Sequence, residues 1–199
     1  MNQTIVKFGG SLLGASGLDA LLAVAARHGA IVVPGGGPFA DTVRAAQQAL
    51  GFGDEAAHQA AILAMEQTAT VLAERAPGFA LCATPGQFSA LAGRPAIWRP
   101  AAMASAAALP ASWDVTSDSL AVWLAIAIGA PRVALLKSAS VAAGGSPERW
   151  AADGLVDAYL PTIARGYDRE IACLGPADPD TLDAYLGAKS LCAKSRQAA

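Results

Sequence analysis

Short apolar runs alternate with longer segments of helical periodicity along almost the whole chain. The short runs are rich in β-branched residues and predict strands, whereas the longer segments repeat apolar residues every three or four positions, as amphipathic helices do. The predicted strands cover residues 4–8, 31–33, 79–82, 96–98, 133–136 and 171–174. The predicted helices cover residues 18–27, 38–50, 54–75, 117–128 and 181–186. Because strands and helices alternate in this way, we expect an α/β fold: a three-layer α/β/α sandwich with a mainly parallel central sheet.

The chain carries no internal repeat and no linker that would divide it. Its 199 residues are enough for one substantial α/β domain. We expect residues 1–186 to form that single domain, with residues 144–154 in a surface loop or short helix. Residues 187–199 are predicted to be a flexible C-terminal tail.

Two glycine-rich segments follow the first and second predicted strands. At such a junction, backbone N–H groups can approach an anion that the dipole of the following helix also attracts. The order of residues differs from the P-loop, because the lysine precedes the glycines, and the Rossmann spacing is missing too. Tight turns also need glycine for steric reasons, but two such junctions with a lysine favour a site for a chain of phosphates. The residues concerned are Lys7, Gly9, Gly10, Ser11, Gly35, Gly36 and Gly37.

A third polar cluster, Thr116, Ser117 and Asp118, begins a predicted helix that is otherwise almost wholly apolar. One interpretation is an ordinary N-cap, in which Thr116 or Ser117 caps the helix and Asp118 complements its dipole. A cap does not require three polar residues, however. Asp118 would also be well placed to orient a lysine from a neighbouring loop.

Composition excludes several classes of partner. The chain is 54% hydrophobic and 15% charged, with a formal net charge of −2. No basic stripe interleaves with aromatic residues, so we expect no nucleic acid partner. The longest apolar stretch, residues 120–128, is far shorter than the roughly 20 residues that span a bilayer, and the N-terminus does not resemble a signal peptide. We therefore expect a cytoplasmic protein that does not insert into membranes.

Cysteine and histidine usage predicts neither disulfides nor a metal site. Cys82, Cys173 and Cys192 are odd in number and far apart, and the first two lie in strand-like runs where buried thiols are usual. The two histidines are thirty residues apart. We therefore assign no metal-binding residues.

Together, the three polar segments resemble those of the amino acid kinase family, which includes acetylglutamate, aspartate and uridylate kinases. In that family, Lys-x-Gly-Gly-Ser opens the first strand-loop, three glycines follow the second strand, and an aspartate-containing motif begins a later helix. The matching segments here are residues 7–11, 35–37 and 116–118, and their order and spacing agree over most of the chain. The resemblance implies an ATP-dependent kinase acting on a small-molecule acceptor.

The resemblance also implies roles for the matching residues. Lys7 would neutralise the transferring phosphoryl group, Asp118 would hold Lys7 in place, and the glycine loops would present N–H groups to the nucleotide phosphates and the acceptor. ATP and Mg²⁺ are the implied cofactors, with Mg²⁺ held mainly by phosphate oxygens and water. Catalysis would rest on positioning and electrostatics, without a covalent nucleophile.

Within the family, the sequence is most similar to a small branch, the [5-(aminomethyl)furan-3-yl]methyl phosphate kinases of methanofuran biosynthesis. The similarity lies in residues 34–41, 56–62 and 113–120. It raises His58 as a contact for a substrate phosphate or amine, although a lone histidine in a helix is more often a packed or solvent-facing residue.

An acceptor that carries both a phosphate and an amine needs cationic groups at one end and acidic groups at the other. Arg44 is a further candidate phosphate contact, although a solvated helix face explains it equally well. Asp41, Asp54 and Glu55 are the candidates for binding the amine.

The C-terminal half, in which this family binds its nucleotide, departs from the family pattern. The usual Thr-Asp-x-Asp-Gly stretch is absent after the predicted strand 133–136. Lys137 and Ser138 stand there instead and are the predicted nucleotide-binding residues. Arg165 corresponds to the second catalytic lysine of the family, and arginine binds phosphate in a different geometry from lysine.

The leading hypothesis is a kinase that phosphorylates a small phosphate-bearing acceptor, [5-(aminomethyl)furan-3-yl]methyl phosphate. One alternative is a kinase of another small acceptor, such as an amino acid, a carbamate or a nucleotide. A second is a catalytically weakened small-molecule-binding protein on the same fold. The apolar excess and the long helix 54–75 also predict a homo-oligomer, most simply a two-fold dimer.

Overall fold

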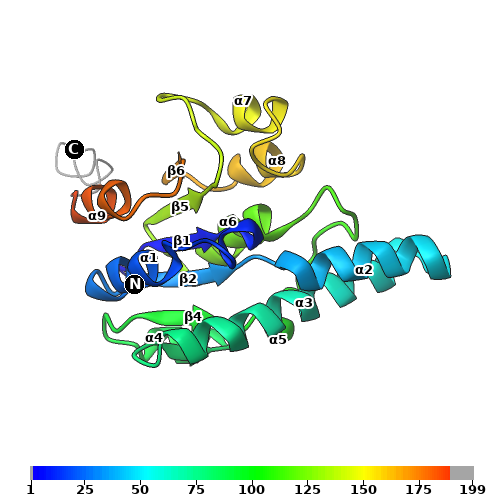
Figure 1. Ribbon diagram of the computed structural model, residues 1–199, viewed down its shortest axis with the longest axis horizontal. Helices are drawn as coiled ribbons and strands as arrows, with labels where there is room; N and C mark the ends of the chain where they lie inside the picture. The colour runs from blue at the N-terminus through cyan, green and yellow to red at the C-terminus, as the bar shows by residue number, and fades with distance from the viewer. Residues whose placement is uncertain (1, 189–199) are drawn as a thin grey trace.

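The centre of the molecule is a six-stranded sheet in which every neighbouring pair of strands is parallel. A computed structural model describes residues 2–188. The strand order is β3-β4-β2-β1-β5-β6, with helices on both faces, as Figure 1 shows. The strands are β1 (Ile5–Phe8), β2 (Ile31–Pro34), β3 (Ala80–Cys82), β4 (Ala96–Trp98), β5 (Arg132–Leu136) and β6 (Glu170–Leu174). The predicted fold class is confirmed, and each predicted strand lies within one residue of an observed one.

The longer predicted helices are also observed. The helices are η1 (a 3₁₀ turn, Gly10–Leu12), α1 (Leu18–Arg27), α2 (Gly37–Leu50), α3 (Asp54–Arg75), α4 (Pro85–Ser89), α5 (Ala101–Ala104), α6 (Ser117–Ile128), α7 (Pro147–Ala152), α8 (Leu160–Ala164) and α9 (Pro179–Gly187). Sequence periodicity missed η1, α4, α5 and α8, because helices of five residues or fewer are too short to show a repeat.

The last helix begins earlier than predicted. Asp178 accepts a hydrogen bond from the backbone N–H of Thr181 and so caps α9, which begins at Pro179, two residues before its predicted start. The helix continues to Gly187, the residue at which the tail was predicted to begin. The rest of the predicted tail lies almost entirely outside the described residues, and so does Cys192. Cys82 and Cys173 are free and buried, as predicted.

The pleat of β1 decides which side chains face which layer of helices. Ile5 packs with residues of α6 on one face of the sheet, whereas Val6 and Phe8 pack with residues of α1 and α9 on the other. Because successive side chains of a strand alternate between faces, Lys7 lies on the same face as Ile5, under α6. The strand thus directs one cation toward the first turn of α6.

Both glycine loops leave the sheet at the same edge, from the neighbouring strands β1 and β2. The backbone N–H of Gly35 donates to the carbonyl of Phe8 at 2.8 Å. A Cβ atom on Gly10 would overlap the backbone of Gly37, and Gly37 has a φ of +53°, so neither position has room for another residue without strain. The two loops therefore meet, as expected if both bind one chain of phosphates.

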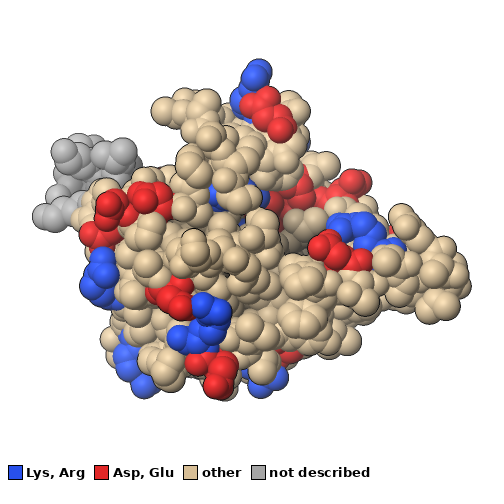
Figure 2. All heavy atoms as spheres, in the orientation of Figure 1, with Lys and Arg blue, Asp and Glu red and all other residues tan. Residues whose placement is uncertain are grey.

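The helices α2 and α3 form an antiparallel hairpin that extends beyond the sheet (Figure 1). None of the residues of α2 is buried, while the second half of α3 reaches the core through Ala69 and Leu72. Leu50 and Leu63 are 78% and 55% exposed. On the face that Figure 2 shows, the projecting end of the hairpin is covered mainly by uncharged side chains. Among the described residues, no helix is long and apolar enough to cross a membrane.

Candidate active site

Three charged side chains from three different elements meet at the carboxyl edge of the sheet. Lys7 comes from β1, Asp118 from the first turn of α6, and Lys137 directly follows β5. The Nζ atom of Lys7 lies 2.9 Å from Oδ1 of Asp118. The Nζ atom of Lys137 lies 2.8 Å from Oδ1 and 2.7 Å from Oδ2 of the same carboxylate. One carboxylate therefore binds two lysines.

All three side chains are nearly buried, with exposed fractions of 7% for Lys7, 6% for Asp118 and 12% for Lys137. Burial by itself would raise the pKa of Asp118, but the charges of Lys7 and Lys137 outweigh burial and lower this pKa, so the carboxylate stays ionised. Burial lowers the pKa of Lys137, and the neighbouring charge of Lys7 lowers it further against the attraction of Asp118. With both lysines protonated, the cluster carries one net positive charge.

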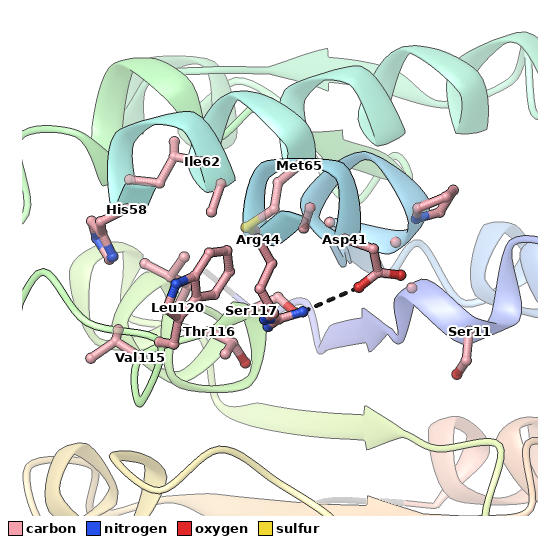
Figure 3. Close-up of a pocket in the computed structure, with 17 residues that line it drawn as sticks. Ser11, Asp41, Arg44, His58, Ile62, Met65, Val115, Thr116, Ser117 and Leu120 are labelled. Carbon is pink, nitrogen blue, oxygen red and sulfur yellow. Dashed lines mark hydrogen bonds and ion pairs between the residues drawn. The ribbon is translucent and has the colours of Figure 1, made fainter. Parts of the chain in front are cut away.

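A cavity of about 520 Å³ opens beside this cluster. The two glycine loops, α2, α3 and the segment before α6 form its walls (Figure 3). The structure thus brings together most of the residues predicted from sequence to bind phosphate or substrate. Those that line the cavity are Gly10, Ser11, Gly36, Gly37, Arg44, His58, Thr116 and Ser117.

The remaining glycine-loop residues do not line the cavity but pack against residues at the site. Gly9 lies against Lys7, since a Cβ built on it would be 3.7 Å from the Nζ atom. Gly35 packs on the other loop, since a Cβ there would be 2.6 Å from the backbone nitrogen of Gly10. The hydroxyl groups of Ser11 and Ser138 form a hydrogen bond with each other at 3.2 Å. Either hydroxyl can be the donor.

Arg44 is held over the cavity by the side chains of Asp41 and Trp113. It donates to Asp41 at 3.2 Å, and its guanidinium carbon lies 4.2 Å from the centre of the Trp113 ring. The indole N–H of Trp113 in turn donates to Gln47 at 2.6 Å, which joins the segment before α6 to α2. Trp113 was not assigned a role from the sequence.

His58 lies at the opposite end of the cavity from Ser11, beside Ile62 (Figure 3). Burial lowers the pKa of His58, while a hydrogen bond with the backbone of Ser112 acts in the opposite direction. The imidazole is therefore largely neutral near pH 7. A neutral ring suits a hydrogen bond with a polar group of the acceptor better than it suits binding of a phosphate.

The structure does not bring Arg165 to this site. Arg165 directly follows α8, which runs along α6 in the same direction: Leu160, at the start of α8, lies at the first turn of α6, and Gly166 lies beside Ile126 in its last turn. Arg165 therefore lies toward the far end of α6 from Asp118, and Asp118 and Ile126 are about 12 Å apart along this helix. The second cation beside Asp118 is Lys137, for which the sequence predicted only nucleotide binding.

The capping interpretation of the third polar cluster is also corrected. Thr116 occupies the N-cap position of α6, but its side chain makes no capping hydrogen bond. The carboxylate of Asp157 caps the helix instead and accepts hydrogen bonds from the backbone N–H groups of Thr116 and Ser119. Sequence reasoning missed Asp157, and the only signal was an isolated acid within the apolar segment 155–160.

The residues at this edge of the sheet fit a magnesium–nucleotide complex. Two lysines and two glycine loops offer cations and backbone N–H groups, which are the groups that bind phosphates. Within residues 2–188, no group of three or more His, Cys, Asp or Glu could hold a metal ion. A Mg²⁺ ion here would therefore depend on phosphate oxygens and water for most of its ligands.

Comparison with known proteins places this site in a family. Residues 2–140 match the model of the amino acid kinase family. The chain belongs to this family. Its membership supports phosphoryl transfer to a small molecule, and Lys7, the glycine loops and Asp118 all lie within the matched residues.

Solved structures of two uridylate kinases share the fold. The crystal structure of uridylate kinase from Archaeoglobus fulgidus matches with a TM-score of 0.69 and 16% identity over 94% of this chain and 97% of that one. The crystal structure of UMP kinase from Ureaplasma parvum matches with a TM-score of 0.64 and 13% identity over 96% of this chain and 97% of that one. Among curated proteins, none matches this sequence significantly.

The substitution Asp118→Asn tests the charge balance of the cluster. At pH 7 we expect it to lower the free energy of unfolding by about 3–5 kcal/mol, because two buried ammonium groups lose their counter-charge. Without Asp118, the pKa of Lys137 in the folded protein falls further below its pKa in the unfolded protein. Between these two pKa values the unfolded chain binds more protons, so the free energy of unfolding of the variant increases as the pH rises through this range. Urea unfolding at pH 7 and pH 10 measures both effects.

The control is Asp183→Asn, which removes an exposed carboxylate that is ion-paired with Arg27. It should change stability little at either pH. A loss in Asp118→Asn no larger than in this control would show that the lysines do not depend on Asp118.

Proposed function

We propose that this protein transfers the terminal phosphoryl group of ATP to a small, phosphate-bearing acceptor in the cytoplasm. The observation that supports this most strongly is the pair of buried lysines held by one carboxylate, Asp118, at the point where two glycine loops meet beside a cavity. A transferring phosphoryl group spreads negative charge over its oxygens, and fixed cations in a nearly dry site stabilise that charge strongly.

In this proposal each part of the site has one task. The glycine loops hold the phosphates through backbone N–H groups, and Lys7 and Lys137 neutralise the charge that develops during transfer. Asp118 keeps both ammonium groups in place without cancelling them, because the cluster retains a net positive charge. When the acceptor oxygen belongs to a phosphate monoester, it is already anionic, so the site needs no strong general base.

We further propose that the acceptor is [5-(aminomethyl)furan-3-yl]methyl phosphate, converted to its diphosphate in the synthesis of a methanofuran-type one-carbon cofactor. The similarity of residues 34–41, 56–62 and 113–120 to that branch of the family motivates this choice, and all three segments contribute to the cavity. Arg44 and the glycine loops suit the phosphate, while the apolar wall near Ile62 suits a flat ring. Asp41 is our choice for the amine, because it lines this cavity, whereas Asp54 and Glu55 are not among the lining residues.

We propose that the nucleotide base lies on the β6 side of the lysine pair. A second cavity of about 410 Å³ lies there, lined by Val141, Gly144, Trp150 and residues 171–174 of the edge strand β6. The indole nitrogen of Trp150 is buried and has no hydrogen-bond partner among the described residues. This apolar pocket would hold a base without the acidic stretch that relatives carry after β5.

The test is ADP formation by the purified protein with Mg-ATP and a panel of acceptors. We expect the aminomethylfuran phosphate to be the best substrate, with a kcat/KM at least about tenfold above that of the same compound lacking its amine, because only the amine can form a charge-assisted hydrogen bond with Asp41. Asp41→Asn should remove this preference, whereas Asp54→Asn serves as the matched control and should keep it.

Equal kcat/KM values for the two compounds would refute amine recognition and favour another small acceptor. Binding of nucleotide without ADP formation, for every acceptor in the panel, would favour the binding-protein alternative.

We also propose that a second copy of this chain covers the exposed side of the α2–α3 hairpin. Its solvent-facing residues between 56 and 71 include Leu63 and Val71 and no charged side chain. Sedimentation velocity at micromolar protein should therefore give a species larger than the 20.0 kDa monomer. Leu63→Glu should shift it toward the monomer, and a wild-type monomer would contradict the proposal.

A further inference from the structure

Asp157 is a buried carboxylate that lies outside the cavity and makes no contact with either lysine. The residue is 9% exposed and precedes α8. Its Oδ2 atom accepts hydrogen bonds from the backbone N–H of Thr116 at 3.0 Å, the hydroxyl of Thr116 at 2.9 Å and the backbone N–H of Ser119 at 2.9 Å. Its Oδ1 atom accepts from the hydroxyl of Ser119 and from the backbone N–H of Leu160 at 3.0 Å.

These contacts surround the residues that form the active site. Thr116 and Ser119 lie on either side of Ser117 and Asp118 in the sequence, so Asp157 fixes the turn of α6 that carries Asp118. The bond to Leu160 also fixes the start of α8, which means that one carboxylate ties together the N-termini of two helices. Both helix dipoles attract its negative charge.

The burial of Asp157 has an electrostatic cost. Burial raises the pKa of this carboxyl group, the hydrogen bonds from Ser119 and Thr116 lower it, and the nearby charge of Asp118 raises it. A neutral serine or asparagine could cap α6 alone without this cost. A carboxylate, however, accepts five hydrogen bonds on two oxygens, which an amide cannot do because half of it is a donor.

We propose that Asp157 is a positioning residue: it fixes the first turn of α6 and so holds Asp118 in reach of both Lys7 and Lys137. This inference rests on the phosphoryl transfer proposed above. Asp118 must meet two ammonium groups from two different strands at once, so a small shift of the helix terminus would favour one lysine over the other. Misplacement of a catalytic group by about 1 Å can cost on the order of 100-fold in rate.

The test compares Asp157→Asn with Asp178→Asn. Both replace an aspartate that caps a helix, but Asp178 caps α9, which carries none of the cluster. We expect kcat for ADP formation to fall roughly 10- to 100-fold in Asp157→Asn, with acceptor KM changed less than about threefold, and to stay near the wild-type value in Asp178→Asn. A merely structural role would lower the melting temperature of both variants and leave kcat of the folded enzyme unchanged.

A second readout does not require activity. Acylation of lysine side chains, followed residue by residue by mass spectrometry, reports how much of each amine is neutral. If Asp157→Asn displaces Asp118, the pKa of Lys137 falls, and its acylation at pH 8 should become about threefold faster or more. An inactive wild type would refute the proposed function, while this labelling would still test Asp157.

Ser119→Ala is the second variant, because it removes one hydrogen bond to Asp157 and leaves the cavity lining intact. It should change kcat and labelling in the same direction by a smaller factor, and it decides the question if Asp157→Asn does not fold. Wild-type kcat and wild-type Lys137 labelling in the folded variants would overturn the proposal. An equal loss of kcat in Asp178→Asn would overturn it as well.

Discussion

The site depends on a single buried carboxylate that separates two like charges. Lys7 lies in β1 and Lys137 directly follows the neighbouring strand β5, so the parallel sheet brings their ammonium groups to the same edge. Two buried cations at such close range would repel each other and lower each other's proton affinity. Asp118 makes the arrangement stable, because α6 crosses the same face of the sheet and places its first turn between them.

Because Asp118 binds lysines from both halves of the chain, both halves contribute to a single site. The N-terminal half supplies the glycine loops, the α2–α3 hairpin and the cavity wall, while β5 and the segment after it supply Lys137 and Ser138. The hydroxyls of Ser11 and Ser138 meet across the two loops. In the proposed reaction, phosphates that bridge the acceptor and the nucleotide would lie near these hydroxyls, between the cavity that Arg44 lines and the second cavity, which Trp150 lines.

Some parts of this arrangement can be predicted from the sequence, and others cannot. The strands and the long helices were predictable because their residues repeat with periods that depend only on local geometry, and the glycine loops because so few residues tolerate the backbone that they need. The pairing of Lys137 with Asp118 was not predictable, since it depends on β5 lying beside β1. Asp157 was missed for a similar reason: it caps a helix whose N-cap residue, Thr116, lies 41 residues earlier in the chain. The position of Arg165 away from this cluster was not predictable either, because the direction of α8 relative to α6 is a property of packing that no local pattern records.

The central claim is that both lysines act on one phosphoryl group through one shared charge balance. The most direct measurement is kcat for ADP formation in Lys7→Ala, Lys137→Ala and the double variant. When one lysine is removed, Asp118 neutralises the other and no net positive charge remains. Each single substitution should therefore lower kcat by roughly 100-fold or more, and the double variant should lose more than either single variant, because Asp118 then leaves a net negative charge beside the phosphates. A double variant no slower than the worse single variant, or a single variant with nearly normal kcat, would contradict this account.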